Sequence, residues 1–468
     1  MIKFGTDGWR ARIAEEFTFD NVRLVAQALV NHLQETGLAA QGVAVGYDNR
    51  FQSEEFARAA AEVCAGAGLA TLLTEHSVPS PVLSYAVKNR GLGIGIMITA
   101  SHNPPDWNGF KIKENFGGSA FPETTLAVEK QLNKIQKSKV KSQNSGIAQV
   151  TMFDPDPEYL AKIKSLVDID RIKAAGIRTI IDPMHGSGGG YFAKLGLPVT
   201  EIRGQRDPLF GGVNPEPLPV NLEESLSFVR ETALKYQGEL TACIVLDGDA
   251  DRLAAIDASG RFINTHNVFS LLLRHLKVNR RLGGSVVKTF NLTNLIDKLC
   301  AKYGQQLAVT PIGFKYIAKK MIEGDVLLGG EESGGMGLKG FIPERDGILA
   351  GLTLLELMAT EKKTLAQILD EVMGELGYFY YDRTDLKTEK ARAIVDRLTV
   401  RPPASFAGLA IARVENLDGL KFNFEDESWI LFRASGTEPL LRVYVEGRTP
   451  DQVKTILGAG EDLVRQNS

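Results

Sequence analysis

Six short runs of apolar residues, separated by amphipathic segments, constrain the fold more than any other feature of the sequence. In each run apolar side chains occupy both odd and even positions, so a strand there would need cover on both of its faces. Parallel strands that lie between layers of helices have this pattern. Residues 18–35 are an example of the intervening helices, because their apolar residues recur on one face and Gly37 follows as a stop signal. We therefore predict an α/β protein. The six runs are residues 42–46, 93–100, 177–181, 241–246, 284–287 and 326–328.

The length of the chain, 468 residues, predicts three or four domains at about 100–200 residues each. A polar stretch at residues 137–146 indicates a linker or exposed loop that closes the first domain. Beyond about residue 373 the pattern changes to shorter apolar runs separated by turns, with helices expected at residues 388–398 and 450–465. This change indicates a smaller α+β domain at the C-terminal end.

The charge balance excludes several classes of partner. The net charge is −3, with 54 Lys and Arg residues against 57 Asp and Glu residues, and the basic residues form no block. Such a surface offers no electrostatic footprint for nucleic acid or an anionic membrane, so we expect small-molecule chemistry. No stretch reaches the ~18 uncharged apolar residues of a membrane span, and charges occupy the place of a signal peptide's apolar core. The cysteines are scattered singly, which favours a reducing, cytoplasmic location over a disulfide framework or a zinc site. They are Cys64, Cys243 and Cys300.

Polar and glycine-rich segments follow three of the apolar runs directly, at residues 99–103, 247–252 and 329–335. In open α/β sheets, ligands bind at the carboxyl ends of the strands. Three such ends from distant parts of the chain predict one shared cleft.

Asp247, Asp249 and Asp251 alternate in a short loop after an apolar run. Three hard oxygen ligands suit Mg²⁺ or Ca²⁺. A calcium-binding EF-hand is disfavoured because Arg252 and Ala258 stand where its glycine and glutamate are needed. The alternative is an acidic turn that caps a helix, but three carboxylates so close together would repel one another without a cation.

Ser101 follows another apolar run and is a candidate nucleophile, phosphate carrier or helix cap. A hydrolase elbow is excluded because Thr99 and Asn103 occupy its glycine positions. Lys111 and Lys113 alternate in the next segment, which places both side chains on one face. A lysine near a carboxylate cluster can carry a proton, although solvated surface lysines are equally expected.

Two further loops could bind ligands. Glu331, Glu332 and Ser333 lie among glycines and suit the recognition of sugar hydroxyls, with a plain glycine turn as the alternative. Residues 433–439 combine an arginine, two hydroxyls and a glycine, which can surround a phosphate or form a hairpin turn. ATP-binding and dinucleotide-binding motifs lack their defining glycines and lysine in this sequence.

Taken together, four motifs in order make the chain similar to the α-D-phosphohexomutase family of phosphoglucomutases and phosphomannomutases. The resemblance covers essentially the whole chain, and the opening residues 4–10 match as well. The four motifs are residues 99–104, 247–252, 330–334 and 433–439.

This resemblance implies four domains around one central cleft. Three would be α/β domains with mixed sheets, and the fourth an α+β domain that closes over the ligand. We place their limits at residues 1–152, 153–256, 257–372 and 373–468.

The resemblance also implies roles for individual residues. Ser101 would carry the transferable phosphoryl group, and Asp247, Asp249 and Asp251 would hold Mg²⁺ together with it. Lys111 would transfer a proton, with His102 and Arg252 supporting the phosphate and the serine. Substrate would be bound by Arg10, Lys315, Glu331 and Ser333, and its non-reacting phosphate by Arg433, Ser435, Gly436 and Thr437.

The implied activity is that of a phosphoglucomutase, acting on sugar phosphates as a monomer or homodimer, with glucose 1,6-bisphosphate as intermediate and activator. Gly335 and Glu332 favour the glucose type, because phosphomannomutases and phosphoglucosamine mutases often have histidine at the position of Gly335. Those two mutase activities stay open as alternatives, as does a glucose 1,6-bisphosphate synthase that releases the bisphosphate. A sugar-phosphate-binding protein without turnover is disfavoured, because no essential group is missing.

Overall fold

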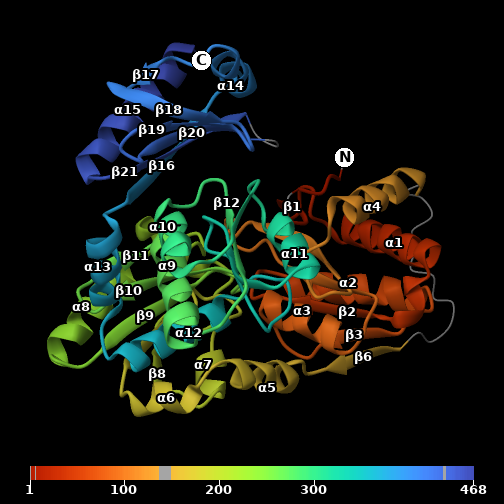
Figure 1. Ribbon diagram of the computed structural model, residues 1–468. Helices are drawn as coiled ribbons and strands as arrows, with labels where there is room; N and C mark the ends of the chain where they lie inside the picture. Colours follow the sequence, from red (N-terminus) through yellow and green to blue (C-terminus); the bar gives the residue numbers. More distant parts are fainter. Residues whose placement is uncertain (1, 6, 136–148, 436–438, 468) are drawn as a thin grey trace.

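The computed structural model of this protein describes residues 2–5, 7–135, 149–435 and 439–467. These residues form four sheets, arranged with the fourth standing apart from the other three (Figure 1). The linker predicted at residues 137–146 lies outside the described residues. No helix in the described ranges is long and apolar enough to cross a membrane.

The first sheet has the strand order β1-β5-β4-β2-β3-β6, in which β5 runs antiparallel to both neighbours while β2, β3, β4 and β6 are parallel. Its strands are β1 (Trp9–Arg12), β2 (Val43–Tyr47), β3 (Thr71–Thr74), β4 (Ile94–Ile98), β5 (Trp107–Glu114) and β6 (Val150–Phe153). The accompanying helices are α1 (Phe19–Thr36), α2 (Ser53–Gly66), α3 (Ser80–Asn89) and α4 (Pro122–Lys134).

The second sheet, ordered β11-β10-β9-β7-β8, and the third, ordered β13-β12-β14-β15, are also mixed. The second contains β7 (Arg178–Asp182), β8 (Val199–Glu201), β9 (Thr241–Leu246), β10 (Leu253–Asp257) and β11 (Phe262–Ile263), with α5 (Asp156–Leu166), α6 (Ile169–Ala174), α7 (Tyr191–Lys194) and α8 (Glu223–Lys235). The third contains β12 (Ser285–Thr289), β13 (Leu307–Thr310), β14 (Val326–Gly330) and β15 (Met336–Leu338), with α9 (Thr265–Arg274), α10 (Leu295–Tyr303), α11 (Phe314–Glu323), α12 (Gly347–Glu361) and α13 (Leu365–Leu376).

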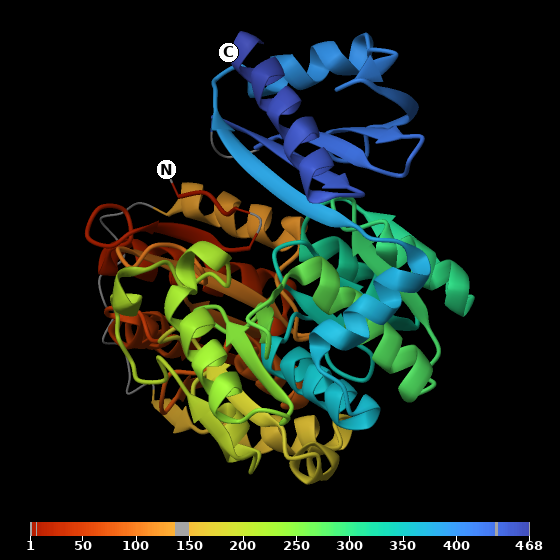
Figure 2. The ribbon, with the colours of Figure 1, turned by 90° about the vertical axis from the view of Figure 1, so that its left-hand side faces the viewer.

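The fourth sheet is antiparallel, with the order β16-β21-β20-β19-β18-β17. Figure 2 shows β16 running along the junction between this unit and the rest of the molecule. The predicted fold class, three α/β units with mixed sheets followed by an α+β unit, is confirmed; the domain limits given above stay a prediction. The elements are β16 (Tyr380–Lys387), β17 (Ser405–Phe406), β18 (Leu409–Glu415), β19 (Leu420–Phe424), β20 (Trp429–Ala434) and β21 (Leu440–Gly447), with α14 (Ala391–Val400) and α15 (Pro450–Asn467).

Local sequence signals set several helix ends. The Thr18 hydroxyl accepts a hydrogen bond from the Asn21 amide and caps α1, which ends at Gly37 with a φ of 76°. Glycine adopts this left-handed conformation without the steric cost of a side chain. Helix α3 starts at Ser80 and has Pro81 in its first turn, where the missing amide hydrogen of proline costs no helical hydrogen bond.

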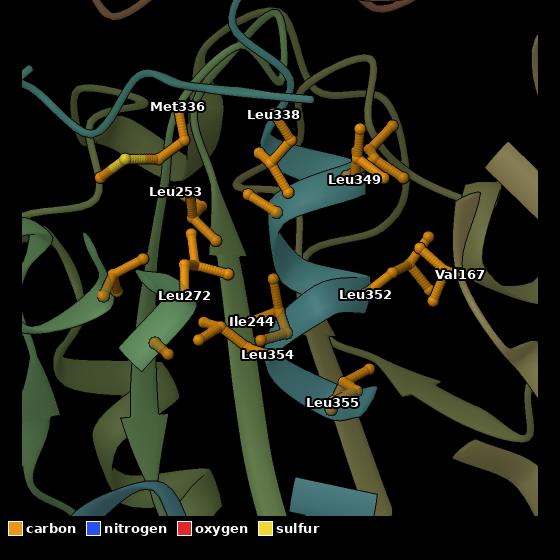
Figure 3. Packing of buried hydrophobic residues seen from close by; sticks show 14 of the residues in the cluster. Val167, Ile244, Leu253, Leu272, Met336, Leu338, Leu349, Leu352, Leu354 and Leu355 are labelled. Carbon is orange, nitrogen blue, oxygen red and sulfur yellow. The ribbon is translucent and has the colours of Figure 1, made fainter. Parts of the chain in front are cut away.

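Helix α12 joins the second and third units into one core. Its residues 347–359 are all buried, as expected for a helix that is apolar on every side. The helix packs against α6, α9, β9, β10 and β15, so both the second and third sheets contact it. Figure 3 shows Leu352 directed toward Val167 and Leu354 toward Ile244. The fourth unit has a separate core of its own.

Replacing Leu354 by alanine should destabilise the protein by about 2–5 kcal/mol, because the cavity left in this packed core cannot fully collapse. Urea unfolding followed by circular dichroism measures the loss. Leu126→Ala, at a side chain that is 55% exposed, is the control and should change little. A loss below about 1 kcal/mol at Leu354 would show that α12 is not the centre of the shared core.

Candidate active site

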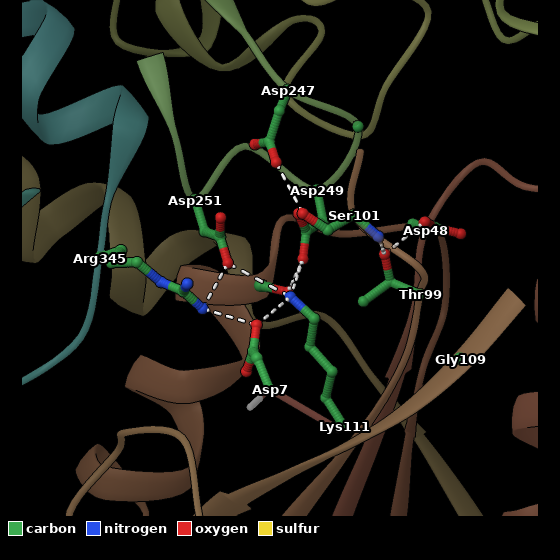
Figure 4. A network of polar contacts seen from close by, with 12 residues as sticks. Asp7, Asp48, Thr99, Ser101, Gly109, Lys111, Asp247, Asp249, Asp251 and Arg345 are labelled. Atoms are coloured by element: carbon green, nitrogen blue, oxygen red, sulfur yellow. Dashed lines mark hydrogen bonds and ion pairs between the residues drawn. The ribbon is translucent and has the colours of Figure 1, made fainter. Parts of the chain in front are cut away.

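The loop after β4 holds Ser101 in a left-handed backbone conformation, with a φ of 52°. The Ser101 amide donates to Thr99 Oγ1 at 2.9 Å, and the Thr99 hydroxyl donates to Asp48 Oδ2 at 2.6 Å. Strained conformations of this kind persist where surrounding contacts fix them, often at functional sites. The Ser101 hydroxyl donates to Asp247 Oδ2 at 2.8 Å, which joins the loop after β4 to the loop after β9 (Figure 4).

A buried arginine fixes the rest of this loop. Arg50 donates to the carbonyl oxygens of Ser101 and Asn103, each at 2.6 Å, and to those of Pro104 and Trp107 at 2.8 and 3.1 Å. Burial lowers the pKa of Arg50 to about 10, which still leaves the guanidinium charged near neutral pH. Four carbonyl contacts from one planar group give the serine loop a single conformation.

The three predicted metal ligands form a compact buried cluster. Asp247, Asp249 and Asp251 are fully buried, and each offers a carboxylate oxygen within 4.8 Å of the others. Among the described residues, Asp249 Oδ1 and Asp251 Oδ1 find no hydrogen-bond donor. Burial, followed by the two neighbouring carboxylates, raises the pKa of Asp247 well above its ordinary value. Carboxylate oxygens that lack a hydrogen-bond donor and converge in a buried loop fit a hard divalent cation such as Mg²⁺.

Lys111, on β5, lies against this cluster. Its Nζ is 2.8 Å from Asp249, 3.3 Å from Asp251 and 2.9 Å from Asp7 (Figure 4). Burial opposes the charge of the ammonium, but the three carboxylates outweigh it and raise the pKa of Lys111 above its usual value. Lys111 is therefore a buried cation at the metal loop, and not a solvated surface lysine.

Lys113 shares the same face of β5, as the alternation predicts, and is also buried. Its Nζ is 2.6 Å from Glu344 and 3.1 Å from Ser119 Oγ. The pair links the first sheet to the segment before α12, so Lys113 supports the site without contacting the metal loop.

Arg345 is a central residue of the site that the sequence interpretation missed. Its guanidinium lies 2.7 Å from Asp7, 2.9 Å from Asp251 and 3.3 Å from Glu331. One side chain thereby joins the N-terminal segment to the metal loop, as Figure 4 shows, and it also contacts the loop after β14. Burial opposes its charge, but these carboxylates raise the pKa of Arg345 well above its ordinary value.

The loop after β14 contains the two predicted sugar-binding residues. The Ser333 hydroxyl donates to Glu331 Oε1 at 2.7 Å, which brings the two side chains together. The Leu253 amide donates to the Gly334 carbonyl at 3.2 Å, so this loop also lies beside the metal loop. Glu332 points elsewhere, toward Tyr381 on β16.

Three further predicted residues, His102, Arg10 and Arg252, lie at the serine loop and the metal loop. His102 Nδ1 lies 3.4 Å from the Ser101 hydroxyl, and Arg10 donates to Asn103 Oδ1 at 2.7 Å. Arg252 Nε is 3.7 Å from Asp251. Burial, then the charge of Arg252 and of other nearby cations, lowers the pKa of His102 well below its usual value.

The predicted phosphate-binding residues lie on the fourth unit and are separate from this cluster. Arg433 is the penultimate residue of β20, and its Nε donates to Asp418 Oδ1 at 3.1 Å. Asp418 also accepts a hydrogen bond at 2.9 Å from the Ile312 amide, in the loop that leads to Lys315. Ser435 follows β20, whereas Gly436 and Thr437 lie outside the described residues. Lys315 itself lines a cavity of about 190 Å³ that also contains Asp7 and Ser119.

Three residues of the site escaped the sequence interpretation: Asp7, Arg50 and Arg345. Asp7 lies inside residues 4–10, the opening segment that resembles the phosphohexomutase family, and this position marks it as a candidate site residue. Arg345 belongs to a charged triplet, residues 344–346, directly before an apolar helix. Asp346 caps that helix, whereas a cap gives no reason for the arginine beside it. Arg50 carries no such signal, because four of its contacts are to backbone carbonyls; its ion pair is with Asp48, at 3.3 Å.

Four family models of phosphoglucomutase/phosphomannomutase match successive parts of the chain. They describe alpha/beta/alpha domain I at residues 1–139, domain II at 157–260, domain III at 264–376 and the C-terminal domain at 385–459.

Whole-chain relatives agree with these matches. A phosphoglucosamine mutase from Methanococcus maripaludis is 30% identical, over 83% of this chain and 84% of the relative. A phosphoglucomutase/phosphomannomutase from Thermococcus kodakarensis is 28% identical, over 99% of this chain and 98% of the relative. A crystal structure from Thermus thermophilus, assigned as a phosphomannomutase, shares 35% identity and a TM-score of 0.88 over 99% of both chains. The predicted resemblance is thus confirmed, and this chain belongs to the phosphoglucomutase/phosphomannomutase family of phosphohexomutases, enzymes of the isomerase class.

Proposed function

We propose that this protein is a phosphoglucomutase that interconverts glucose 1-phosphate and glucose 6-phosphate through a phosphoserine at Ser101. Family membership supports phosphohexomutase chemistry in general. The identity of the sugar and of the phosphate-carrying residue are proposals beyond that membership. One observation carries the proposal: the hydroxyl of a strained, immobilised serine lies 2.8 Å from a carboxylate of the buried acidic cluster.

Asp247, Asp249 and Asp251 would hold Mg²⁺ together with the phosphoryl group on Ser101. When bound, the ion neutralises charge on the transferring phosphoryl group, the main requirement of this reaction. The oxygens of Asp249 and Asp251 that lack a hydrogen-bond donor among the described residues support the assignment.

The chain's own residues account for the rest of the cycle. The bond between Ser101 Oγ and phosphorus breaks while the sugar hydroxyl oxygen bonds to phosphorus, which forms the 1,6-bisphosphate. The sugar hydroxyl loses a proton in this step, and Ser101 Oγ gains one. We assign this proton exchange to Lys111, because it is a buried ammonium at the edge of the cluster. After the bisphosphate turns over in the cleft, its C1 phosphoryl group returns to Ser101.

Turnover of the bisphosphate requires contacts that accept both orientations. Glu331 and Ser333 would hold the sugar hydroxyls, and Arg433 and Ser435 the phosphate that is not reacting. Either orientation presents one phosphate to the same arginine, so a single clamp serves both half-reactions.

Glucose is favoured over the alternative sugars by the loop after β14. A side chain at Gly335 would place its Cβ 2.2 Å from Arg345 Cδ, so Arg345 fills the space that a histidine would need there. Gly335 stands where phosphomannomutase-type and glucosamine-type loops often carry histidine, and the buried Arg345 side chain packs against it.

A ³¹P NMR time course with Mg²⁺ and a trace of glucose 1,6-bisphosphate should show glucose 1-phosphate converting to glucose 6-phosphate at about 1 to 1000 per second. Parallel reactions contain mannose 1-phosphate or glucosamine 1-phosphate and should run more slowly. Faster conversion of either sugar would overturn the glucose assignment. Accumulation of the bisphosphate without isomerisation would instead identify a bisphosphate synthase.

A further inference from the structure

Glu332 lies between the two predicted sugar-binding residues, yet its carboxylate points away from them toward β16. The Tyr381 hydroxyl donates to Glu332 Oε1 at 2.9 Å. Arg383 Nη1 donates to Oε1 at 3.0 Å and to Oε2 at 3.2 Å. Glu332 therefore has two charge-assisted contacts and one hydroxyl contact with a single strand.

The Glu332 contacts are largely buried, and aromatic side chains pack around Tyr381. The Glu332 side chain is 13% exposed, and burial opposes its charge, but Arg383 and other nearby groups outweigh burial and lower the pKa of Glu332. The Tyr381 ring packs against His266 on α9, with 4.0 Å between ring centroids, and against Trp429 at 6.4 Å. Packing against His266 and Trp429 fixes the Tyr381 ring, so that its hydroxyl stays within hydrogen-bond distance of Glu332.

The neighbouring residue, Glu331, connects the same loop to the metal loop through Arg345. Glu331 contacts Arg345 at 3.3 Å, and Arg345 contacts Asp251 of the metal loop at 2.9 Å. The short loop after β14 is thus held at one residue by the metal loop and at the next by β16.

Strand β16 is also the segment that leads the chain into the fourth unit. It follows α13 after Gly377, whose φ of 99° favours glycine, and it lies along the junction in Figure 2. Other contacts across this junction come from separate segments, such as the Asn294 amide to Glu446 Oε1 at 2.9 Å. Movement of the fourth unit would be passed to the loop after β14 through Glu332.

We propose that Glu332 is a positioning residue: by binding Tyr381 and Arg383 it sets the placement of Glu331 and Ser333 relative to the phosphate-binding unit. The inference rests on the proposed function, because it takes Glu331 and Ser333 as the sugar ligands. It assigns Glu332 no contact with the sugar. Affinity for a sugar phosphate should then depend on Arg383 as much as on Glu332.

A double-mutant cycle tests this coupling. Glu332→Gln, Arg383→Met and their combination are made in a Ser101→Ala background, and glucose 1-phosphate binding is measured by isothermal titration calorimetry. We expect each single substitution to weaken binding about tenfold, a usual size for coupling between sites, and the double substitution to weaken it no further. Tyr381→Phe removes one of the hydrogen bonds and should weaken binding in the same direction by a smaller factor. It also serves as a second test if Arg383→Met does not fold.

Three controls separate positioning from a general loss of structure. Asp385→Asn removes a carboxylate from the same strand, where it pairs with Arg442 at 3.4 Å, and should leave glucose 1-phosphate affinity unchanged. Affinity for Mg²⁺ should stay constant in all variants, because the acidic cluster is not altered. Affinity for inorganic phosphate should stay constant as well, because the predicted phosphate clamp lies on the fourth unit.

The outcomes are distinguishable. Loss of sugar-phosphate affinity in Glu332→Gln with full affinity in Arg383→Met would mean that Glu332 touches the sugar, and would overturn the inference. Additive losses in the double variant, or unchanged affinity in all variants, would overturn it too. If the Ser101→Ala protein bound neither glucose 1-phosphate nor the mannose and glucosamine analogues, the proposed function would fail first and the inference with it.

Discussion

Ser101→Ala is expected to abolish interconversion of glucose 1-phosphate and glucose 6-phosphate, while binding of glucose 1-phosphate stays near normal. The variant removes the oxygen that would form the bond to phosphorus, and no neighbouring hydroxyl occupies the same position in the loop. Coupled-enzyme assays give the rate, and calorimetry gives the affinity. Retention of even a tenth of the wild-type rate would rule out Ser101 as the phosphate carrier.

The matched control for this substitution is Ser84→Ala. Ser84 is a buried serine on α3 whose hydroxyl has no hydrogen-bond partner among the described residues. Its loss should leave turnover unchanged. Intact-mass measurement after incubation with glucose 1,6-bisphosphate completes the test, because wild type and Ser84→Ala should gain a phosphoryl group and Ser101→Ala should not.

Asp249→Ala is expected to lower turnover by about a thousandfold or more and to weaken Mg²⁺ binding. Asp249 Oδ2 accepts hydrogen bonds from Lys111 at 2.8 Å and Ser80 at 2.5 Å, which leaves Oδ1 available for a cation. The substitution removes this ligand and one of the three carboxylates around Lys111. Calorimetric titration with Mg²⁺ and the rate at saturating Mg²⁺ measure the two effects.

Asp257→Asn provides the comparison, because Asp257 is a buried carboxylate at the end of β10 that binds backbone amides of Ser259 and Ala366. It should retain the Mg²⁺ affinity of the wild type even if it lowers stability. Unchanged metal dependence in Asp249→Ala would refute the ligand assignment.

Local pattern was enough to place the loops that build the site. Apolar runs at residues 93–100, 241–246 and 326–328 become β4, β9 and β14, and a polar segment follows each. Ligands bind at the carboxyl ends of strands in such sheets, so the place of each loop follows from the strand pattern. The three strands belong to three different sheets, so the packing of the units brings the loops together.

The burial and the ion-pair partners of the charged side chains were harder to predict from the sequence. Alternation placed Lys111 and Lys113 on one face of a strand, but it did not reveal that both are buried and paired with carboxylates from other units. The burial of a lysine depends on what packs over it, and that is decided by segments far away in the sequence.

The direction of the Glu332 side chain could not be predicted from the sequence either. Its place in a glycine-rich loop after β14 suggested recognition of a sugar, whereas its carboxylate binds Tyr381 and Arg383 about 50 residues away. In a short glycine-rich loop, adjacent side chains can face opposite directions, and sequence alone does not say which one faces the cleft.

The elements, the order of the motifs and the chemical types of the site residues follow from the amino-acid sequence, because apolar periodicity and loop composition are local properties. Which charges meet depends on how the units pack against one another. Asp7 and Arg345 are separated by 338 positions and form a contact of 2.7 Å at the centre of the site. Such ion pairs are fixed only when the units pack together and exclude water, because each charge must then find its partner within the buried site.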